Sequence, residues 1–366
     1  MSFSGLSVGL VGPLPPPAGG MANQTRQLAE LLRAAQASVW MVQTNAPYRP
    51  QWAGRIPVLR AAFRLLPFLW QLWRAAGRSD LFHVMANSGW SWHLFAAPAI
   101  WVARLRGVPV VVSYRGGEAG EFLQRSQSVV RASMQRAARL IVPSGFLEQI
   151  FGRHGMPALV VPNIVDLRRF RPAEAPVPGR LHLVVARNLE ALYDNESALR
   201  ALQIVRRSHP QATLTIAGTG PQAEYLKSLA QELQLTGAVH FAGRLDPDAM
   251  AELYRGADVA LNPSLADNMP NSVLEGLASG VPVVSTDVGG VPFMVRHEVH
   301  ALLVPPRSPQ EMAAAVLRLS EDPALKQRLV TAGLAEVQRY TWDAVAPLLA
   351  SVYRSVLGAQ SPAPAR

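Results

Sequence analysis

The sequence predicts an α/β protein built from two doubly wound domains, each with a parallel sheet covered by helices on both faces. The chain has 366 residues, which exceeds the usual size of a single domain. Short apolar runs alternate with helix-patterned or loop segments along most of it, as is typical of parallel strands joined by crossover helices. Residues 162–180 break this alternation, because they are rich in Pro and Arg and lack a helical period. They indicate a linker, and the cleft between the two domains is the expected ligand site.

The first set of apolar runs precedes this linker. A buried strand at residues 6–12 is followed by a turn-rich loop with Gly19 and Gly20 and then by a helix to about Ala35. Strand, glycine-containing loop and helix open an α/β domain, and glycine lets a ligand approach the backbone at a helix start. A flexible turn after the proline run explains the same glycines equally well. Further strands are expected at 38–43, 81–85, 108–113, 140–143 and 158–161.

A second alternating set follows the linker, and the chain ends with a helix-patterned stretch from Trp342 to Leu357. The last residues, GAQSPAPAR, have the composition of a disordered tail. The strands of this second set are expected near 181–186, 213–217, 239–242, 259–262 and 282–285. The predicted division is 1–165 for the first domain, 166–180 for the linker, 181–340 for the second domain, 341–358 for a helix crossing back toward the first domain, and 359–366 for the tail.

Composition narrows the class of protein. A hydrophobic content of 49% suffices for two cores, and the absence of cysteine excludes a disulfide scaffold and agrees with a reducing cytoplasm. We expect neither a signal peptide nor a membrane span, because the N-terminus lacks a basic region and no apolar run of about 18 residues occurs. The net charge is +10, but Lys is scarce and no nucleic-acid-binding module is recognisable, so nucleic acid is not an expected partner.

The positive charge is concentrated in residues 49–78, which carry six Arg and no acidic residue, interleaved with Trp and Phe. This composition is typical of surfaces that bind anionic lipid at the membrane interface. The alternative is an amphipathic helix that packs on its own domain and exposes its arginines to water. Pro57 and Pro67 are expected to interrupt any helix here.

Residues 261–290 contain the most informative pattern. Proline and asparagine end regular structure after Pro263, and a helix is expected from about Asn271 to Ser279. A helix start offers unpaired backbone N–H groups and a partial positive charge, which suit a phosphate. Glu275, one turn inside, can bind ribose hydroxyls as acidic residues do in dinucleotide sites, and Asp267 precedes it by eight residues. The alternative reading is a turn-forming Asp and a surface Glu.

No other chemistry is as well supported. Asp246 and Asp248 have the spacing of a metal-binding carboxylate pair, but with Pro247 between them they are typical of a helix start. The eight His are scattered without a metal-binding pair, so no metal site is expected, and His93 is only a weak acceptor-side candidate. Ser144 lacks the surroundings of a nucleophile elbow and is expected to cap a helix.

The run SLADNMPNSVLEGLASGVPVVSTDVGGVP resembles the C-terminal-domain signature of the retaining GT-B glycosyltransferases of family 4, in which two acidic residues eight apart flank the sugar-nucleotide site. DLFHV, IVPSGFL, VVARNLEAL, TIAGTGP and VHFAGRL occur in the family's order, so the resemblance covers nearly the whole chain. It implies the GT-B fold, a nucleoside diphosphate sugar in the second domain, an acceptor in the first, and no metal or other cofactor.

The resemblance also implies roles for individual residues. Asp267 would contact the donor sugar in place of the family's first Glu, and its side chain is one methylene shorter than that Glu. Glu275 would bind the ribose. Arg187 would neutralise the departing phosphate. The other donor-binding positions that it implies are Gly20, Gly218, Gly220, Arg244, Leu245, Asn271, Ser272 and Val273. The backbone of the last three would hold the diphosphate.

Two departures from the family pattern bear on catalysis. A Lys usually follows the Arg by several residues, but NLEALYDNES offers none, and the usual His is replaced in SYRGG by Tyr114 and Arg115. Arg115 can touch a sugar or phosphate but stays protonated and cannot act as a base. In a front-face transfer the leaving diphosphate can take the acceptor's proton, so the protein mainly positions reactants and stabilises charge.

These observations predict a metal-independent retaining transferase that moves a hexose-type sugar from a nucleoside diphosphate sugar to a glycan or lipid-linked acceptor, in cell-surface polysaccharide or glycolipid synthesis. It is expected in the cytoplasm, peripheral on the inner leaflet through residues 49–78. The alternatives are a non-catalytic scaffold that binds nucleotide sugars, which the missing Lys and His favour, and a GT-B-fold nucleotide-sugar epimerase.

Overall fold

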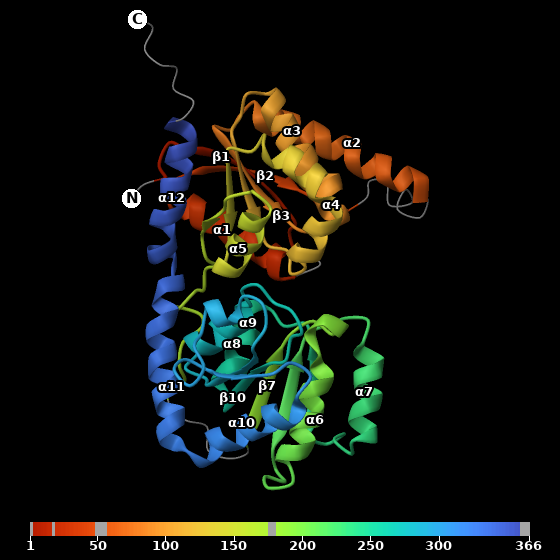
Figure 1. Cartoon of the computed structure of the whole chain (residues 1–366), viewed down its shortest axis with the longest axis vertical. Helices are drawn as coiled ribbons and strands as arrows, with labels where there is room; N and C mark the ends of the chain where they lie inside the picture. The colour runs from red at the N-terminus through yellow and green to blue at the C-terminus, as the bar shows by residue number, and fades with distance from the viewer. Residues whose placement is uncertain (1–2, 17–18, 48–56, 175–180, 359–366) are drawn as a thin grey trace, which may run out of the picture. The chain divides into compact units, whose positions relative to one another are not determined.

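The chain forms two compact units, each with a parallel six-stranded sheet and helices around it (Figure 1). The first unit consists of Met1–Asn163 and Asp343–Arg366, and the second of Ile164–Trp342. The computed structural model describes residues 3–16, 19–47, 57–174 and 181–358, without the side chains of 57–62. The predicted tail at 359–366, residues 49–56 of the basic segment and residues 175–180 of the predicted linker lie outside the described residues. The α/β class with two doubly wound sheets is confirmed.

In the first unit, the strand order is β2-β1-β3-β4-β5-β6 and all neighbours are parallel. The chain therefore runs outward from β1 to β2 and then reverses to β3, so that β1 and β3 flank a topological switch point. The strands are β1 (Ser7–Gly12), β2 (Ser38–Gln43), β3 (Leu81–Ala86), β4 (Val110–Tyr114), β5 (Arg139–Val142) and β6 (Leu159–Val160).

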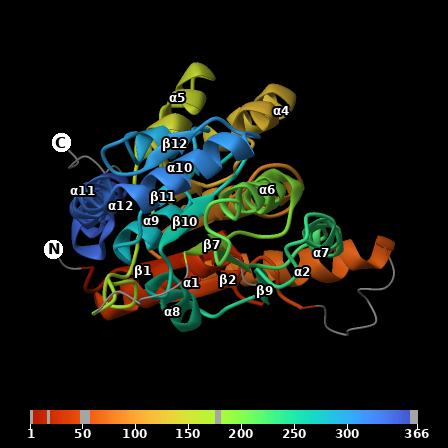
Figure 2. The same ribbon diagram turned by 90° about the horizontal axis from the view of Figure 1, so that it is seen from below.

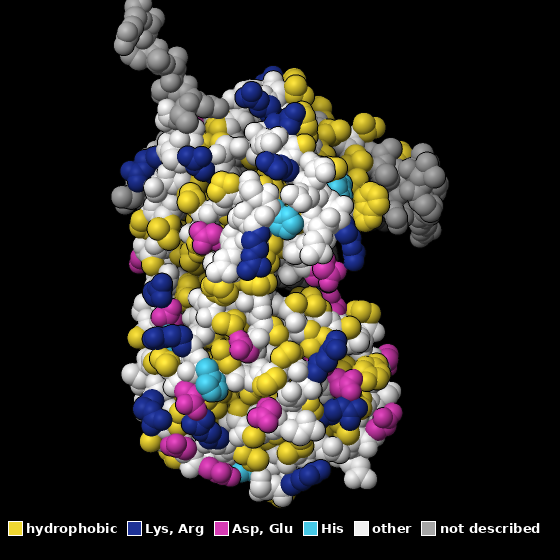
Figure 3. Space-filling view, viewed as in Figure 1, with side chains coloured by type: hydrophobic (Ala, Val, Ile, Leu, Met, Phe, Trp, Pro, Cys, Tyr) yellow, Lys and Arg dark blue, Asp and Glu magenta, His cyan; other side chains and the backbone are white. Residues whose placement is uncertain are grey.

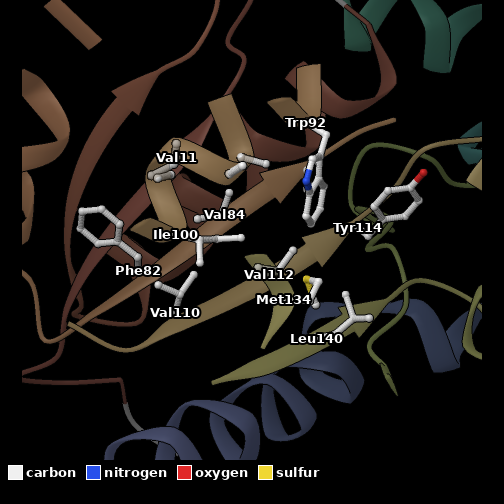
Figure 4. Packing of buried hydrophobic residues seen from close by; sticks show 14 of the residues in the cluster. Val11, Phe82, Val84, Trp92, Ile100, Val110, Val112, Tyr114, Met134 and Leu140 are labelled. Atoms are coloured by element: carbon white, nitrogen blue, oxygen red, sulfur yellow. The ribbon is translucent and has the colours of Figure 1, made fainter. Parts of the chain in front are cut away.

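Helices cover both faces of this sheet. Because parallel crossovers are right-handed, α1 lies on one face, whereas the four helices that follow it lie on the other. These four share one hydrophobic core with alternate strand residues such as Val84, Val110 and Val112 (Figure 4). The helices are α1 (Gly20–Ala34), α2 (Pro57–Ala76), α3 (Ala97–Leu105), α4 (Ala119–Met134), α5 (Gly145–Arg153) and α12 (Trp342–Gly358), and a π-helix, η2 (Trp92–Ala96), precedes α3.

The last helix, α12, is anchored to the sheet by a buried polar pair. The hydroxyl of Tyr353 lies 2.7 Å from Nδ1 of His83 on β3, and its ring meets that of Phe3 edge-on. Burial, aided by the charge of Arg115, lowers the pKa of His83 to about 3, so this imidazole is neutral at physiological pH. His83 therefore has a structural partner inside the first unit.

The expectation that Pro57 and Pro67 interrupt the basic segment is wrong, because α2 runs through both. Pro57 is the first residue of the helix, where its missing N–H breaks no hydrogen bond. Pro67 lies in the interior but on the exposed side. Phe68 and Leu72 are buried in the core and hold the helix on the sheet past this point. Tertiary packing thus outweighs the local cost of the proline.

In the second unit, the strand order is β12-β11-β10-β7-β8-β9, again with parallel neighbours. The chain runs outward from β7 through β8 to β9 and then returns to β10, so β7 and β10 flank the switch point of this sheet. The strands are β7 (His182–Ala186), β8 (Thr213–Ala217), β9 (Val239–Gly243), β10 (Val259–Asn262), β11 (Val283–Thr286) and β12 (Leu302–Val304).

Two hydrophobic cores lie on the two faces of this second sheet. One is covered by α6 and α10, which pack against each other (Figure 2), together with α7 and α11. The other is covered by α8 and α9. The helices are α6 (Asn195–Val205), α7 (Ala223–Glu232), α8 (Pro247–Arg255), α9 (Asn271–Ala278), α10 (Pro309–Glu321) and α11 (Pro323–Glu336).

Candidate nucleotide-sugar site

Most of the predicted residues of the second unit converge at its switch point. β7 ends at Ala186 and β10 ends at Asn262, and these two strands are paired neighbours whose connections leave in opposite directions. Parallel strands arranged in this way leave a crevice at their carboxyl ends, where open α/β sheets bind ligands. Arg187 follows β7 directly, and the loop that carries Asp267 follows β10.

Arg187 is the centre of this crevice. Its guanidinium forms an ion pair with Asp267, donates to the Ser272 hydroxyl at 3.4 Å, and lies over the Tyr193 ring, 4.1 Å from the ring centre. The side chains of Arg187 and Asp267 are only 10% and 14% exposed. Its Nε is buried and has no hydrogen-bond partner among the described residues. Arg187 therefore holds a buried N–H donor that an anionic ligand can use.

Two carboxyl groups accompany this cation. Burial raises the pKa of Asp267, although the nearby Arg187 charge opposes the shift. Burial raises the pKa of Glu275 to about 8, again against the effect of Arg187. Glu275 is therefore mostly protonated at neutral pH, and its carboxyl can donate one hydrogen bond as well as accept others. A protonated carboxyl such as that of Glu275 can therefore hydrogen-bond to two neighbouring hydroxyl groups of a ligand.

The start of α9 lies beside Arg187. The helix follows Pro270, which supplies no side-chain cap, and its first turn contains no acidic residue to offset the helix dipole. Ser272 is fixed on three sides: its hydroxyl accepts from Arg187 and donates to Asn262 Oδ1 at 3.4 Å, and its carbonyl accepts from the buried Tyr254 hydroxyl at 3.0 Å. The positive end of the helix is thus held rigidly at the crevice.

Close backbone approach explains the glycines of this site. A Cβ at Gly218 would overlap the carbonyl of Arg187, and one at Gly220 would overlap the carbonyl of Leu189. The loop after β8 therefore presses on the loop that carries Arg187. Leu189 N–H also donates to the Thr219 carbonyl at 3.1 Å.

The sequence reasoning missed a second such contact. A Cβ at Gly289 would overlap the carbonyl of Asp267, and one at Gly290 would overlap that of Asn268, while Gly290 N–H donates to the Asp267 carbonyl at 2.9 Å. The loop after β11 thus packs against the backbone of the loop that carries Asp267 and holds it in place. The two glycines in TDVGG were the only sign of this contact in the sequence, but a local pattern does not show which loop a glycine packs against. Tyr193 and Tyr254 were also missed.

Other predicted positions lie apart from this cluster. Arg244 and Leu245 follow β9, which β8 separates from β7 in the sheet. Asp246 caps α8, since its carboxylate accepts from the backbone N–H of Asp248 at 3.0 Å and of Ala249 at 2.8 Å. The interpretation of this acidic pair as a helix start is therefore confirmed.

Arg115 and Gly20 belong to the first unit. Gly20 opens α1. Arg115 donates to the Ser113 hydroxyl at 3.1 Å and to the side-chain oxygens of Gln24 and Asn163. Burial lowers its pKa to about 10, so it remains a cation at neutral pH. Arg115 thus links β4 to α1 and to Asn163 through hydrogen bonds within the first unit.

Ser144 differs from its expectation. It occupies the N-cap position of α5 with extended backbone, but its side chain makes no capping hydrogen bond, and its hydroxyl is buried without a partner among the described residues. The prediction that Ser144 caps through its hydroxyl is therefore wrong. The position follows from the Pro-Ser-Gly sequence, whereas the rotamer depends on packing that the sequence does not show.

Two solved structures share this architecture over nearly the whole chain. Sucrose-phosphate synthase from Thermosynechococcus elongatus superposes with a TM-score of 0.75 at 24% identity, covering 97% of this chain and all of that one. The HepE protein of Anabaena, solved with UDP, superposes with a TM-score of 0.73 at 17% identity, covering 96% of this chain and 100% of that one. At these identities the likeness establishes the GT-B fold.

Family models then define the family. Residues 19–163 match the glycosyl transferase 4-like domain, and residues 181–322 match the glycosyl transferases group 1. The chain belongs to the group 1 glycosyltransferases of the GT-B fold, as its motifs predicted.

Curated relatives agree with this assignment. Glycogen synthase of Mycobacterium tuberculosis is 30% identical over 274 residues, which are 71% of this chain and 66% of that protein. D-inositol 3-phosphate glycosyltransferase of Acidothermus cellulolyticus is 34% identical over 230 residues, or 58% of this chain and 51% of that protein. The matched part therefore spans between about half and two thirds of these relatives, and their acceptors differ from one another.

Proposed function

We propose that this protein transfers a hexose-type sugar from a nucleoside diphosphate sugar to a glycan or lipid-linked acceptor, with retention of configuration and without a metal ion or other cofactor. One observation carries the proposal: a buried arginine with an unused N–H, a helix start without an acidic first turn, and two carboxyl groups meet at the switch point of the second sheet. The HepE protein of Anabaena, similar in fold, has been solved with UDP and with UDP-glucose.

The arrangement supports a definite placement of the donor. Arg187 can retain Asp267 through a terminal nitrogen and donate from Nε to the diphosphate, which also meets the backbone at Asn271 to Val273. Glu275, one turn further along α9, binds the ribose hydroxyls. Asp267 faces the sugar. The Asp267 side chain is shorter than a Glu, but its ion pair with Arg187 holds the carboxylate in the crevice, where it can contact the sugar.

The chemistry follows from these positions. The bond between the anomeric carbon and the diphosphate breaks, the acceptor oxygen bonds to the same carbon on the same face, and the leaving diphosphate takes the acceptor's proton. Arg187 and the start of α9 stabilise the negative charge that grows on the phosphate. A single such donor lowers the activation free energy by about 3–4 kcal/mol. The absent Lys and His therefore lower the rate without removing the mechanism.

The competing functions predict different assays. A scaffold would bind nucleotide sugars without turnover, and an epimerase would change the sugar without releasing the nucleotide. We would incubate the protein with uridine, guanosine and adenosine diphosphate sugars and a lipid-linked acceptor pool, and measure free nucleoside diphosphate and labelled glycolipid together. Release of nucleotide with label in the acceptor supports the transferase. Tight donor binding with neither product would refute it in favour of the scaffold.

The proposed location is the cytoplasmic leaflet of a membrane, bound peripherally. Residues 1–163 contain 16 Arg, no Lys and five acidic residues, so they account for the chain's positive charge. On the face drawn in Figure 3, acidic side chains are more numerous on the second unit than on the first. No helix in the described part of the chain is long and apolar enough to cross a membrane. The excess charge is thus available for attraction to anionic headgroups.

Exposed tryptophans accompany these arginines. Trp70 and Trp73 on α2 are 58% and 48% exposed, although Phe68 and Leu72 of the same helix are buried. The helix therefore has a second apolar side in addition to the one packed on its own domain. Four Arg–Trp pairs mark this surface, with the guanidinium 3.9–4.8 Å from the ring centre: Arg74–Trp70, Arg78–Trp40, Arg106–Trp73 and Arg136–Trp101. Tryptophan beside arginine suits the headgroup region of a bilayer.

Flotation with vesicles tests this location. We expect the protein to float with vesicles of phosphatidylcholine and phosphatidylglycerol at about 0.15 M salt and to remain in solution with phosphatidylcholine alone. Replacing Trp70 and Trp73 together by Ala should abolish flotation. Tyr225→Ala, an equally exposed aromatic residue of the second unit (49%), is the control and should float normally. Flotation that is independent of anionic lipid or of the two tryptophans would contradict the proposal.

A further inference from the structure

A pocket of the first unit lies at the carboxyl end of its sheet, beside the switch point between β1 and β3. One wall follows β3 and the other is the first half of α4, so the pocket is complete within this unit. Its volume is about 390 Å³, within the usual range for a small-molecule site. It is lined by Ser88, Gly89, Trp90, His93, Glu118, Glu121, Phe122, Arg125 and Ser126.

Both walls depart from regular helix geometry. The helix after β3 begins as a π-helix over Trp92–Ala96, which includes His93. In α4, Ser126 has φ −129° and ψ 15°, which kinks the helix at the pocket. Gly89, with φ +65°, makes the turn that leads to Trp90. Such irregularities weaken helix hydrogen bonding and occur often at functional sites, so their position on both sides of one pocket points to a binding role.

The pocket has an aromatic side. Trp90 is 78% exposed, the largest value among the exposed large hydrophobic residues that the structure describes. Its ring meets His93 at 6.2 Å between ring centres, and His93 meets Phe122 at 6.0 Å. Phe122 is buried and stacks on Tyr114, so the row is anchored in the core. An exposed indole on a fixed support offers an apolar face to a flat ligand.

The charge of this pocket is opposite to that of its surroundings. Two of the five acidic residues in 1–163, Glu118 and Glu121, line it. Glu121 pairs with Arg125 at 3.4 Å, whereas Glu118 makes no ion pair within the described parts of the chain. Carboxylates accept hydrogen bonds from hydroxyl or ammonium groups and repel other anions. The site thus favours a neutral or cationic ligand in an otherwise basic unit.

We infer that this pocket binds a neutral or amino sugar ring of the acceptor, with the C–H face of the ring on Trp90 and its hydroxyl or amino groups on Glu118 and Glu121. The two carboxylates disfavour a uronic acid ring, or a sugar phosphorylated at this ring, through like-charge repulsion. The identification of the ligand as the acceptor rests on the proposed transferase function, but binding of the sugar ring is independent of the donor site in the second unit.

Titration calorimetry of the full chain with three methyl glycosides tests the inference. Methyl glucoside and methyl glucosaminide should bind at millimolar concentration, and methyl glucuronide at least about tenfold more weakly because of like-charge repulsion. Trp90→Ala should weaken all three. Replacing Glu118 and Glu121 together by Gln should remove the discrimination against glucuronide, a change that mere structural damage would not produce. Tyr225→Ala, an exposed aromatic residue of the second unit (49%), is the control and should leave the binding of all three glycosides unchanged.

Stabilisation by UDP, measured on each variant, separates this inference from the proposed function. Unchanged UDP stabilisation with altered sugar binding supports the pocket. Glucuronide that binds as well as the glucoside, undiminished binding in Trp90→Ala, or no binding of any of the three glycosides overturns it. Loss of the transferase function would appear instead as absent nucleotide binding or absent transfer in the unmodified protein, whatever the glycosides do.

Discussion

Glu275→Gln should make the protein more stable at neutral and alkaline pH. Burial raises the pKa of Glu275 from 4.5 to about 8. Between these values the folded chain holds a proton that the unfolded chain releases, so stability falls as the pH rises through this window. Glutamine resembles the protonated acid and has no such dependence. One pKa unit corresponds to about 1.4 kcal/mol, so the gain at pH 7 is at most about 3 kcal/mol, and about 2 kcal/mol after allowance for partial exposure.

The measurement is a thermal melt as a function of pH. For a unit of this size, about 2 kcal/mol raises the melting temperature by roughly 4–8 °C. We expect this difference between Glu275→Gln and the unmodified protein at pH 7–8, and almost none at about pH 4, where the acid is protonated in the folded state and largely so in the unfolded one. Glu232→Gln, on the exposed part of α7, should show no difference at any pH. A variant less stable than the parent at pH 8 would refute the assignment of a protonated, buried Glu275.

Two further substitutions test the same crevice. Arg187→Lys keeps the charge but loses the forked guanidinium, so we expect kcat, measured with saturating donor, to fall by about 10²–10³ with a smaller change in KM. An equally large change in KM with kcat unaltered would mean that Arg187 binds the donor and does not stabilise the charge of the transition state. Gly290→Ala brings a Cβ onto the Asn268 carbonyl, so it should lower the melting temperature and donor affinity together, whereas Gly237→Ala, with no atom within 4 Å of the new Cβ, should change neither.

The sequence predicted the fold well because buried parallel strands produce uninterrupted apolar runs. β1, β2 and β8 lie within a residue of their expected positions. β12 was missed, since three residues, Leu302–Val304, are too short to stand out from the neighbouring loop. The course of α2 through Pro67 was missed because it depends on the packing of Phe68 and Leu72 against the sheet.

The candidate site was predictable only where one segment carries its own pattern. Glu275 and Asp267 lie in a single stretch whose spacing is visible, and Arg187 was found through the family's motifs. The tight contact of Gly290 on Asn268 joins the loops that follow β10 and β11, and the pocket beside Trp90 depends on a π-helix that no periodicity signals. Such features arise from the mutual placement of elements distant in sequence.

In the proposed mechanism, Tyr193 accounts for how one cation can suffice where the family resemblance implies two. It lies in the segment where the resemblance implies a Lys, and its ring supports the Arg187 guanidinium at 4.1 Å. Burial raises the pKa of this phenol, so it stays neutral and adds no charge. A second buried cation would repel Arg187 and would itself need desolvation. A single arginine, paired with Asp267 and held against an aromatic face, keeps a fixed orientation, and fixed orientation is what electrostatic stabilisation of a transition state requires.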